Sequence, residues 1–261
     1  MIIHKLIAHH LFNRDDPEFY TMQARDALRW IRRGGVALQE GTQVLDLGAG
    51  HGIFGSELQK YGCSVVFADE SNHLMPEMAN FPFLQVNLDK DDVTGLGDYD
   101  LVVCSNVLEH LARPFEFLGA AGNLLKPGGM LYLSWTNWLS PWGGHEFSPF
   151  HYLGSRRGPR FYDRLFRRPR LHTPHVNLFP TYIGRTLAFL RRQPGLRIVR
   201  AAPRYYPEFG FLLKIPVFRE FLSWNCALLI QKAGPGKLQN SLASEGTNPQ
   251  TSRERISSVD P

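Results

Sequence analysis

An acidic residue followed by three closely spaced glycines forms the segment of this chain best suited to bind a ligand. It runs Asp46-Leu47-Gly48-Ala49-Gly50-His51-Gly52 and follows the apolar pair Val44-Leu45. The apolar residues predict a buried parallel strand, and the glycines permit a tight turn that a ligand can approach closely. Open α/β sheets bind ligands at the carboxyl ends of their strands. Asp46 is therefore predicted to accept hydrogen bonds from a cationic amine or from water around it.

A dinucleotide site is the main rival interpretation of the same glycines. The segment Gly50-His51-Gly52-Ile53-Phe54-Gly55 matches G-x-G-x-x-G, and Asp69 follows at a distance suited to a ribose hydroxyl. However, a carboxylate directly before the turn would lie unfavourably near a pyrophosphate, and the turn already begins at Gly48. The spacing therefore favours a different ligand, and a nicotinamide oxidoreductase stays open as an alternative.

A second set of reactive side chains gathers in the span 134–154, which holds three tryptophans, two histidines and several glycines and prolines. A hydroxyl or amine acceptor needs a base that works near neutral pH, and histidine is the natural choice. His145 is the first candidate, oriented by Glu146, and His151 is the second. The alternative is that these residues only brace the loop. Their spacing lacks the helical pattern of known zinc motifs, so no metal ion is predicted.

Strand and helix patterns alternate along the chain and would position both sets of residues. Strands are predicted at 43–47, 64–68, 83–86, 100–104, 129–135, 196–203 and 225–231. Helices are predicted at 15–35, 52–61, 114–125 and 181–192, with a further helix that begins near Ser71 and is stopped at about Pro76. This alternation predicts an α/β fold with a parallel, doubly wound sheet.

Several segments in this order resemble the class I S-adenosylmethionine-dependent methyltransferases. They are motif I at 46–52, the second strand and its acid at 65–71, the fourth strand at 99–106, the Glu-His helix start at 107–111, and the turn into the fifth strand at 124–133. A closer resemblance, which extends to 204–207 and 216–222, is to uncharacterised bacterial methyltransferases. The family resemblance implies a Rossmann-like, seven-stranded, mostly parallel sheet with a long insertion after the fifth strand. The seventh strand would lie antiparallel between the fifth and the sixth.

The resemblance also implies S-adenosylmethionine as the cofactor and assigns residues to it. Asp46 would contact the methionine amino group, and Asp69 would accept hydrogen bonds from the ribose hydroxyls. Asn87 stands where the family often has an acid for the adenine amine, and its carbonyl oxygen can still accept. The implied cofactor-binding residues are Asp46, Gly48, Ala49, Gly50, Asp69, Glu70, Asn87, Leu88, Ser105 and Asn106. Ser105 and Asn106 would lie beside the transferring methyl group, and His110 would support that loop.

Composition and length fit a globular enzyme. The chain has 261 residues, of which 43% are hydrophobic and 20% charged, and its three cysteines are too few and scattered for a disulfide framework or a zinc site. This predicts a cytoplasmic protein, and no stretch reaches the length of a membrane span. The predicted parts are an N-terminal helical cover at 1–40, a cofactor-binding core at 41–135, a substrate lid at 136–180, the rest of the sheet at 181–233, and a disordered tail at 234–261.

A net charge of +5 is concentrated in two groups of arginines, the larger at 156–170. Arginine recognises phosphates and carboxylates, so the partners expected are an anionic acceptor or an anionic membrane surface at which the protein is peripheral. Nucleic acid is less favoured because no RNA-binding module flanks the core. The prediction is methyl transfer to oxygen, or nitrogen, of a small or lipid-linked anionic acceptor. An RNA methyltransferase, a non-catalytic cofactor-binding protein, decarboxylation of the cofactor and polyamine synthesis remain alternatives.

Overall fold

A computed structural model describes His4 and residues 17–234 of the chain. Most of the predicted N-terminal cover before residue 17 and the predicted tail from residue 235 onward lie outside the described residues. Within them, no helix is both long and apolar enough to cross a bilayer.

The described residues form one seven-stranded sheet with the order β3-β2-β1-β4-β5-β7-β6. Strand β7 pairs antiparallel with both β5 and β6, and the pairs among the first five strands are parallel. The strands are β1 Gln43–Leu47, β2 Ser64–Asp69, β3 Phe83–Gln85, β4 Tyr99–Ser105, β5 Leu125–Thr136, β6 Leu196–Pro203 and β7 Asn225–Lys232. This confirms the predicted fold class, including the place of the seventh strand.

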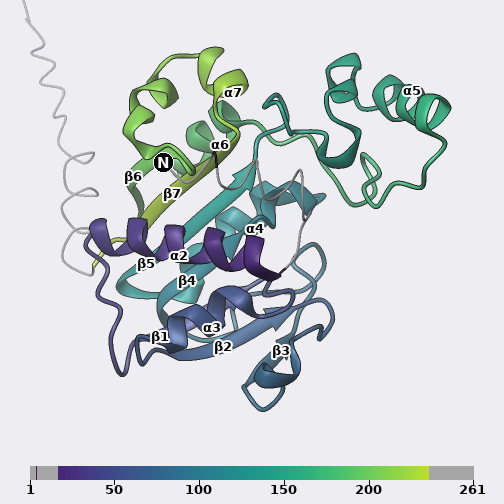
Figure 1. The fold of residues 1–261 in the computed structure, drawn as a ribbon. Helices are drawn as coiled ribbons and strands as arrows, with labels where there is room; N and C mark the ends of the chain where they lie inside the picture. The colour runs from purple at the N-terminus through teal and green to yellow at the C-terminus, as the bar shows by residue number, and fades with distance from the viewer. Residues whose placement is uncertain (1–3, 5–16, 235–261) are drawn as a thin grey trace, which may run out of the picture.

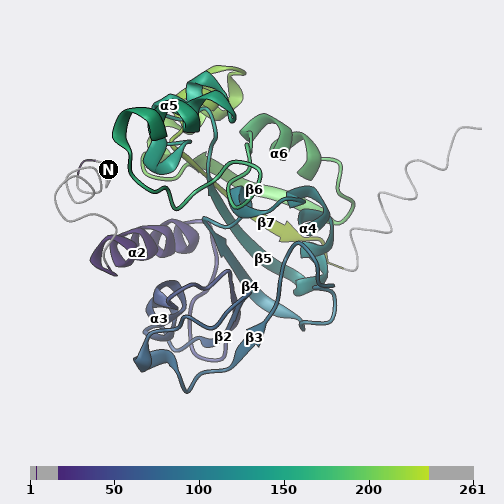
Figure 2. The same cartoon turned by 90° about the vertical axis from the view of Figure 1, so that its right-hand side faces the viewer.

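Helices cover both faces of the sheet (Figures 1 and 2). Helices α2 (Pro17–Arg33) and α3 (Ile53–Gln59) lie on one face, and α4 (Pro114–Ala120) and α6 (Ile183–Leu190) lie on the other. Successive side chains of a strand point to opposite faces. In β1, Val44 therefore packs in the apolar cluster shared with α2 and α3, whereas Leu45 packs in the cluster shared with α4 and α6. Both faces of the central strands β1 and β4 are buried, so their sequences are mostly apolar, whereas the edge strand β6 is partly exposed and carries two arginines.

Two predicted helices differ from the structure. No α-helix begins near Ser71. Instead the side-chain oxygen of Asn72 accepts the backbone N–H of Leu74 at 3.1 Å, a local turn that competes with helix formation, and only the 3₁₀ turn η1 (Pro76–Met78) follows. The helix predicted at 114–125 ends at Ala120 as α4 and continues as the 3₁₀ segment η3 (Ala121–Leu124). Strand β5 then begins at Leu125, earlier than predicted, because Leu125 already pairs with Tyr99 of β4.

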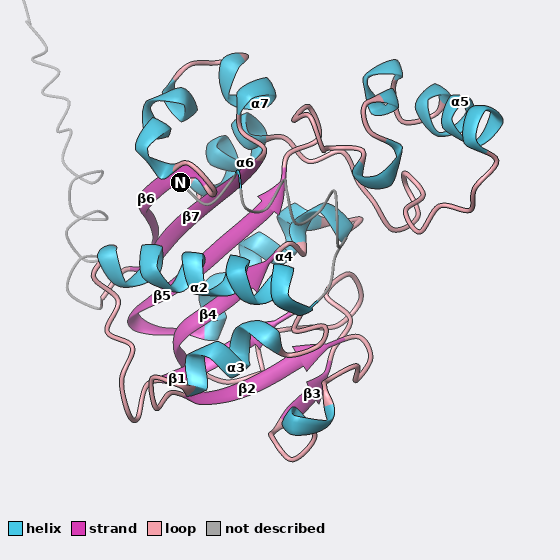
Figure 3. Cartoon of the chain, viewed as in Figure 1, coloured by secondary structure: helices cyan, strands magenta, loops and turns pink. Residues whose placement is uncertain are grey.

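The insertion after β5 is built from short helices and loops rather than sheet (Figure 3). It contains η4 (His145–Phe147), η5 (Phe150–Leu153) and α5 (Arg157–Phe166), and it has a small apolar core of its own around Trp138, Phe147 and Leu178. Two further short elements, η6 (Pro207–Lys214) and α7 (Phe218–Leu222), connect β6 to β7. Helix α5 projects beyond the sheet on the side of the β5 arrowhead (Figure 1). This places the insertion over the strand ends where a ligand is expected.

Candidate active site

A pocket of about 970 Å³ opens at the carboxyl ends of β1, β4 and β5. The glycine turn after β1 and residues of α2 line one part of it, and the insertion lines another. Ligand pockets measure about 300–1,000 Å³. This one therefore has room for a cofactor together with a small acceptor. We call these two parts the cofactor half and the acceptor half.

The cofactor half is formed by a backbone turn that only glycine adopts easily. Gly48 has φ +74° and Gly50 has φ +53°, values in the left-handed region that side chains disfavour. A β-carbon at Gly48 would also lie 2.2 Å from Cγ2 of Val107. The carboxylate of Asp69 accepts the backbone N–H of Gly50 at 2.7 Å and so braces the turn. The turn therefore presents backbone rather than side chains to the pocket.

Asp46 lies at the end of β1 and is 2% exposed. Its Oδ2 accepts the backbone N–H of Gly55, at 2.7 Å. Burial raises the pKa of Asp46 to about 7, against the opposing effect of this hydrogen bond, and the nearby charge of Asp69 adds to the rise. An ammonium group beside the carboxylate would favour its charged form. Asp46 and the open glycine turn thus fit the amino-acid end of S-adenosylmethionine.

The other predicted cofactor residues divide into two groups. Gly48, Ala49, Gly50, Ser105 and Asn106 line the pocket with Asp46. By contrast, Asp69, Glu70, Asn87 and Leu88 lie outside its lining, beyond the glycine turn. There the amide nitrogen of Asn87 donates to Glu70 Oε1 at 2.8 Å. The residues predicted to contact the methionine part of the cofactor therefore share one pocket. The residues predicted to contact its ribose and adenine do not line that pocket.

Three histidines and one glutamate meet in the acceptor half. His172 Nδ1 lies 2.6 Å from Glu146 Oε2, and the backbone N–H of His172 donates to Glu146 Oε1 at 2.6 Å. His110 Nδ1 lies 2.7 Å from the carbonyl oxygen of Asn177. His145, His110 and His172 each offer a ring nitrogen, and these atoms lie within 4.8 Å of one another. We call these three residues the histidine cluster.

The electrostatics of the cluster change the role expected for its members. Burial, together with the neighbouring His172 and His110, lowers the pKa of His145 to about 3, against the opposing effect of Glu146. Burial alone would raise the pKa of Glu146, but the hydrogen bonds from the side chain and backbone of His172 bring it down to about 2. A histidine with so low a pKa is a weak base near neutral pH. Glu146, predicted to orient His145, instead orients His172.

His151, the second predicted base, does not line the pocket. It is buried inside the insertion, where Nε2 lies 3.0 Å from the carbonyl oxygen of Ser140 and the ring packs against Gly144. Burial lowers the pKa of His151 as well. Its surroundings are those of a residue that braces the loop.

Sequence reasoning missed three features of the acceptor half. His172 follows Glu146 only after the whole of α5, so no local spacing links them. Arg204, directly after β6, is buried and lines the pocket. Trp142 of the insertion stacks on Trp224, which precedes β7, with ring centroids 4.0 Å apart and planes at 15°. The tryptophan-rich loop signalled an aromatic wall, but nothing in the sequence identified its partner.

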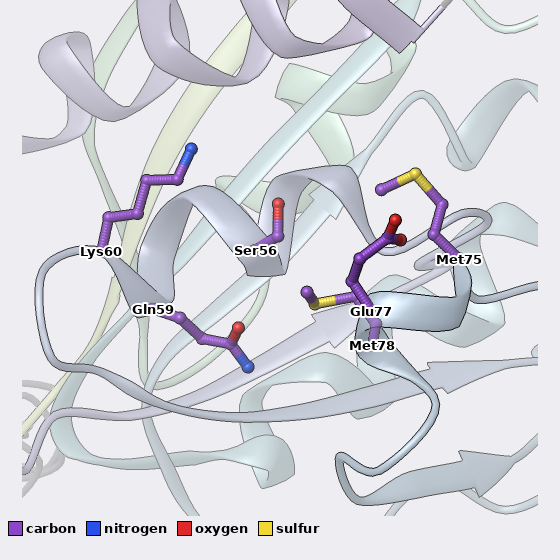
Figure 4. A pocket seen from close by; sticks show the side chains of 6 residues that line it. All are labelled: Ser56, Gln59, Lys60, Met75, Glu77 and Met78. Atoms are coloured by element: carbon purple, nitrogen blue, oxygen red, sulfur yellow. The ribbon is translucent and has the colours of Figure 1, made fainter.

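A second depression, of about 490 Å³, lies between α3 and η1 (Figure 4). Lys60 and Gln59 stand on one side of it, apart from Met75, Glu77 and Met78, and Lys60 forms an ion pair with Glu57. These side chains do not converge on one point. The depression therefore lacks the grouped donors and acceptors of the first pocket.

Comparison with known proteins shows the family of this chain. A family model described as a methyltransferase domain matches residues 19–200. The chain belongs to this methyltransferase family. It is 31% identical over 238 residues to an uncharacterized methyltransferase of Mycobacteroides abscessus, a match that covers 84% of this chain and 90% of that one. A similar relative in Mycobacterium tuberculosis strain H37Rv is also 31% identical over 238 residues, with 87% and 92% covered.

Solved structures share the fold at low identity. An S-adenosylmethionine-dependent methyltransferase from Mesorhizobium loti matches with a TM-score of 0.52 and 19% identity, over 79% of this chain and 98% of that one. Magnesium protoporphyrin IX methyltransferase from Synechocystis, solved with bound S-adenosylhomocysteine, matches with a TM-score of 0.51 and 17% identity, over 82% and 84%. With the family match, the prediction of an S-adenosylmethionine-dependent methyltransferase is confirmed.

Proposed function

We propose that this methyltransferase acts on oxygen, or nitrogen, of an anionic acceptor that is small or lipid-linked. The observation that carries the proposal is a buried arginine in the acceptor half. Arg204 is 3% exposed, and it donates from Nη1 to Asn106 Oδ1 at 3.0 Å and to Ser134 Oγ at 3.2 Å. These partners are neutral, and no carboxylate of the described residues forms an ion pair with it.

A buried cation is unfavourable unless an anion compensates it. The Nε of Arg204 is also buried without a hydrogen-bond partner. The charges of Asp26 and Glu109 act on Arg204 without a direct ion pair. A carboxylate or phosphate on the acceptor would supply that ion pair and the missing hydrogen bond, because the guanidinium group recognises such anions in a fixed geometry. The stacked Trp142 and Trp224 would offer the acceptor a flat apolar wall nearby. This combination supports an acceptor with an acidic group and an apolar body.

S-adenosylmethionine, when bound, supplies the methyl group on a sulfonium, which is already a good leaving group. The protein therefore contributes mainly by alignment, together with removal of a proton from an acceptor hydroxyl. His172 is better suited to accept that proton than His145. Glu146 holds Nδ1 of His172 and leaves the lone pair of Nε2 free, the arrangement by which a carboxylate orients a histidine base. His145 would then shape the pocket beside it.

The surface of α5 supports a lipid-linked acceptor presented at an anionic bilayer. Phe161 and Leu165 are 49% and 57% exposed, and Arg157, Arg160 and Arg164 share the helix with them. A helix that combines exposed apolar and basic side chains binds the interface of anionic membranes. Tyr162 of α5 lines the pocket. An acceptor held at the bilayer would thus reach the active site without leaving the lipid surface.

The test measures transfer of labelled methyl from S-adenosylmethionine to paired acceptors that differ only in an acid or its uncharged ester. We expect the acid to be preferred, and Arg204→Gln to reduce kcat/KM for the acid by roughly 100-fold while the ester is little affected. Unchanged S-adenosylhomocysteine binding by the variant would show that its fold is intact. Equal use of acid and ester would contradict the proposal.

The membrane part of the proposal has its own measurement. Sedimentation with vesicles of phosphatidylglycerol and phosphatidylcholine should recover the protein, whereas vesicles of phosphatidylcholine alone should not. The double variant Phe161→Ser and Leu165→Ser should lose this binding and keep its activity on a short-chain acceptor. Transfer of label into RNA, with a steep dependence on salt, would favour an RNA methyltransferase instead.

A further inference from the structure

We propose that His110, His145 and His172 together bind one divalent transition-metal ion, with zinc preferred. The open coordination position of the ion would face the acceptor half of the pocket. Ion binding stands on the cluster alone, whereas its use in catalysis rests on the proposed function. This proposal differs from the sequence prediction of no metal, because that prediction considered only the spacing of His145, Glu146 and His151.

The geometry of the cluster is close to that of a three-histidine site. The three residues come from separate segments: η2 (Leu108–His110), η4, and the loop that follows α5. Their ring centroids lie 4.5–5.5 Å apart, and their candidate ligand nitrogens lie within 4.8 Å of one another. Zinc binds imidazole at about 2.0–2.1 Å, which puts tetrahedral ligands about 3.4 Å apart. Small rotations of partly exposed rings would bring the nitrogens together.

The hydrogen bonds around the histidine cluster leave Nε2 of His172 and of His110 free to bind an ion. His172 Nδ1 is held by the carboxylate of Glu146 at 2.6 Å, and His110 Nδ1 by the carbonyl oxygen of Asn177 at 2.7 Å. In each ring this places the proton on Nδ1 and leaves the lone pair of Nε2 for an ion. Metal-binding histidines almost always donate their other N–H to a carboxylate or a backbone carbonyl in this way. Here the carboxylate is that of Glu146 and the backbone carbonyl is that of Asn177.

The third histidine, His145, has a buried ring nitrogen that an ion could engage. Nδ1 of His145 is buried and lacks a hydrogen bond of normal geometry, although the backbone of Gly143 lies close enough to act on the ring. An uncharged imidazole with a free lone pair is the form that binds a metal. An ion at the centre of the cluster would satisfy a polar atom that otherwise carries the cost of burial without a partner.

The chemistry of the ligands selects the class of ion. Three nitrogen ligands suit zinc, cobalt, nickel or copper, whereas magnesium and calcium need oxygen ligands. Glu146 is already engaged by His172 through both carboxylate oxygens, so it belongs to the outer layer of the site. Three protein ligands with a fourth position open is the pattern of a catalytic rather than a structural zinc site.

The open position fits the proposed reaction. An acceptor hydroxyl that binds the ion through oxygen would lose its proton more readily, because a bound cation stabilises the anion that is left. With the ion bound, Nε2 of His172 is occupied, so the proton would go to solvent. Only without the ion would His172 accept it, as in the proposed function. The acceptor oxygen then forms a bond to the methyl carbon while the carbon–sulfur bond breaks, its electron pair staying on sulfur. No electrons are gained or lost overall.

The experiment uses the full-length protein, freed of metal with a chelator and then titrated with Co²⁺ and Zn²⁺. We expect about one ion per chain and the visible absorption bands of four-coordinate cobalt, displaced by zinc. His145→Ala and His172→Ala should each weaken binding at least about 100-fold, and Glu146→Gln by about 10–100-fold. His175→Ala is the matched control, because this exposed histidine lies in the same insertion outside the cluster.

The readouts separate the possible failures. Every variant should still bind S-adenosylhomocysteine in calorimetry, which excludes loss of the fold as the reason for weaker metal binding. Absence of cobalt bands, or binding that the two alanine substitutions leave unchanged, would overturn the site. Full methyl transfer by the chelator-treated enzyme would overturn its catalytic use while leaving the proposed function intact. Tight zinc binding without transfer to any anionic acceptor would overturn the proposed function and leave the site intact.

Discussion

The cofactor half and the acceptor half of the pocket are built in different ways. The cofactor half is largely one continuous backbone turn after β1, tied down by Asp46 and Asp69 through hydrogen bonds to the N–H groups of Gly55 and Gly50. The acceptor half consists of side chains from distant segments, among them His110, His172 and Arg204. One half therefore depends on local backbone geometry, and the other depends on the insertion being folded against the sheet.

This difference suggests how the two halves respond to change. A turn of left-handed glycines tolerates almost no side chain, because both its φ angles and its close contacts exclude a β-carbon. The acceptor half is lined by side chains on short 3₁₀ helices and loops, elements that tolerate substitution better than packed strands. We expect substitutions in the cofactor half to weaken cofactor binding whatever the acceptor, and substitutions in the acceptor half to change the rate and the selectivity for acceptors.

The largest effect is expected from Asp46→Asn. Removing the charge should weaken S-adenosylmethionine binding by roughly 100-fold, because a charge-assisted hydrogen bond to the amino group is lost. The variant should be at least as stable as the parent at pH 8. The pKa of Asp46 is raised to about 7 in the folded protein, so its ionisation costs folding free energy as the pH rises from its usual pKa to about 7. Calorimetry and thermal unfolding test both points, and unchanged affinity would contradict the assignment of Asp46.

Gly48→Ala should damage the cofactor half through the fold itself. The new β-carbon would meet Val107 Cγ2 at 2.2 Å at a residue whose φ is +74°. We expect a loss of about 2–3 kcal/mol in the free energy of unfolding. Gly95→Ala is the matched control, since no atom lies within 4 Å of its β-carbon. Urea unfolding of both variants measures the difference, and equal stabilities would argue against a strained turn.

Glu146→Gln tests the acceptor half. The carboxylate accepts from the backbone N–H of His172 and holds its ring, with both distances 2.6 Å. We expect turnover to fall by about 10–100-fold because an outer partner of this kind orients the histidine, while S-adenosylhomocysteine affinity stays unchanged. Steady-state kinetics with calorimetry distinguishes these effects. A loss of cofactor affinity equal to the loss of turnover would mean that the two halves are not independent.

The smallest expected effect is the pH dependence of cofactor binding. It should arise from Asp46 in the cofactor half and not from the acceptor half. Below its pKa of about 7, Asp46 is protonated in the free protein, and the cofactor ammonium would require it ionised. S-adenosylmethionine binding should therefore release a proton and become about tenfold weaker from pH 8 to pH 6. Asp46→Asn should abolish this dependence, and Glu146→Gln should retain it. Calorimetry in buffers of different ionisation enthalpy measures the proton, and a flat profile in the parent would contradict the raised pKa.

The fold and the cofactor half were largely predictable because their signals are local. The apolar strand residues, the glycines from Gly48 to Gly52 and the strand-end position of Asp46 all lie within one stretch of chain. The helix expected near Ser71 was wrong because a single side chain, Asn72, captures the local backbone. The length of β5 was underestimated because its pairing with β4 already begins at Leu125, opposite Tyr99. A local hydrogen bond outweighed the residue pattern in the first case, and a strand pairing between residues far apart in the sequence did so in the second.

The order of residues alone determined the alternating strands and helices, the glycine turn and the family, since each depends on neighbours along the chain. Only the tertiary structure decided that Glu146 holds His172 rather than His145, that His151 is enclosed in the insertion, and that Arg204 faces the same pocket from the end of β6. The physical reason is that these contacts form between segments far apart in sequence. Which histidine meets which carboxylate depends on how the insertion packs over the strand ends, and no local spacing encodes that choice.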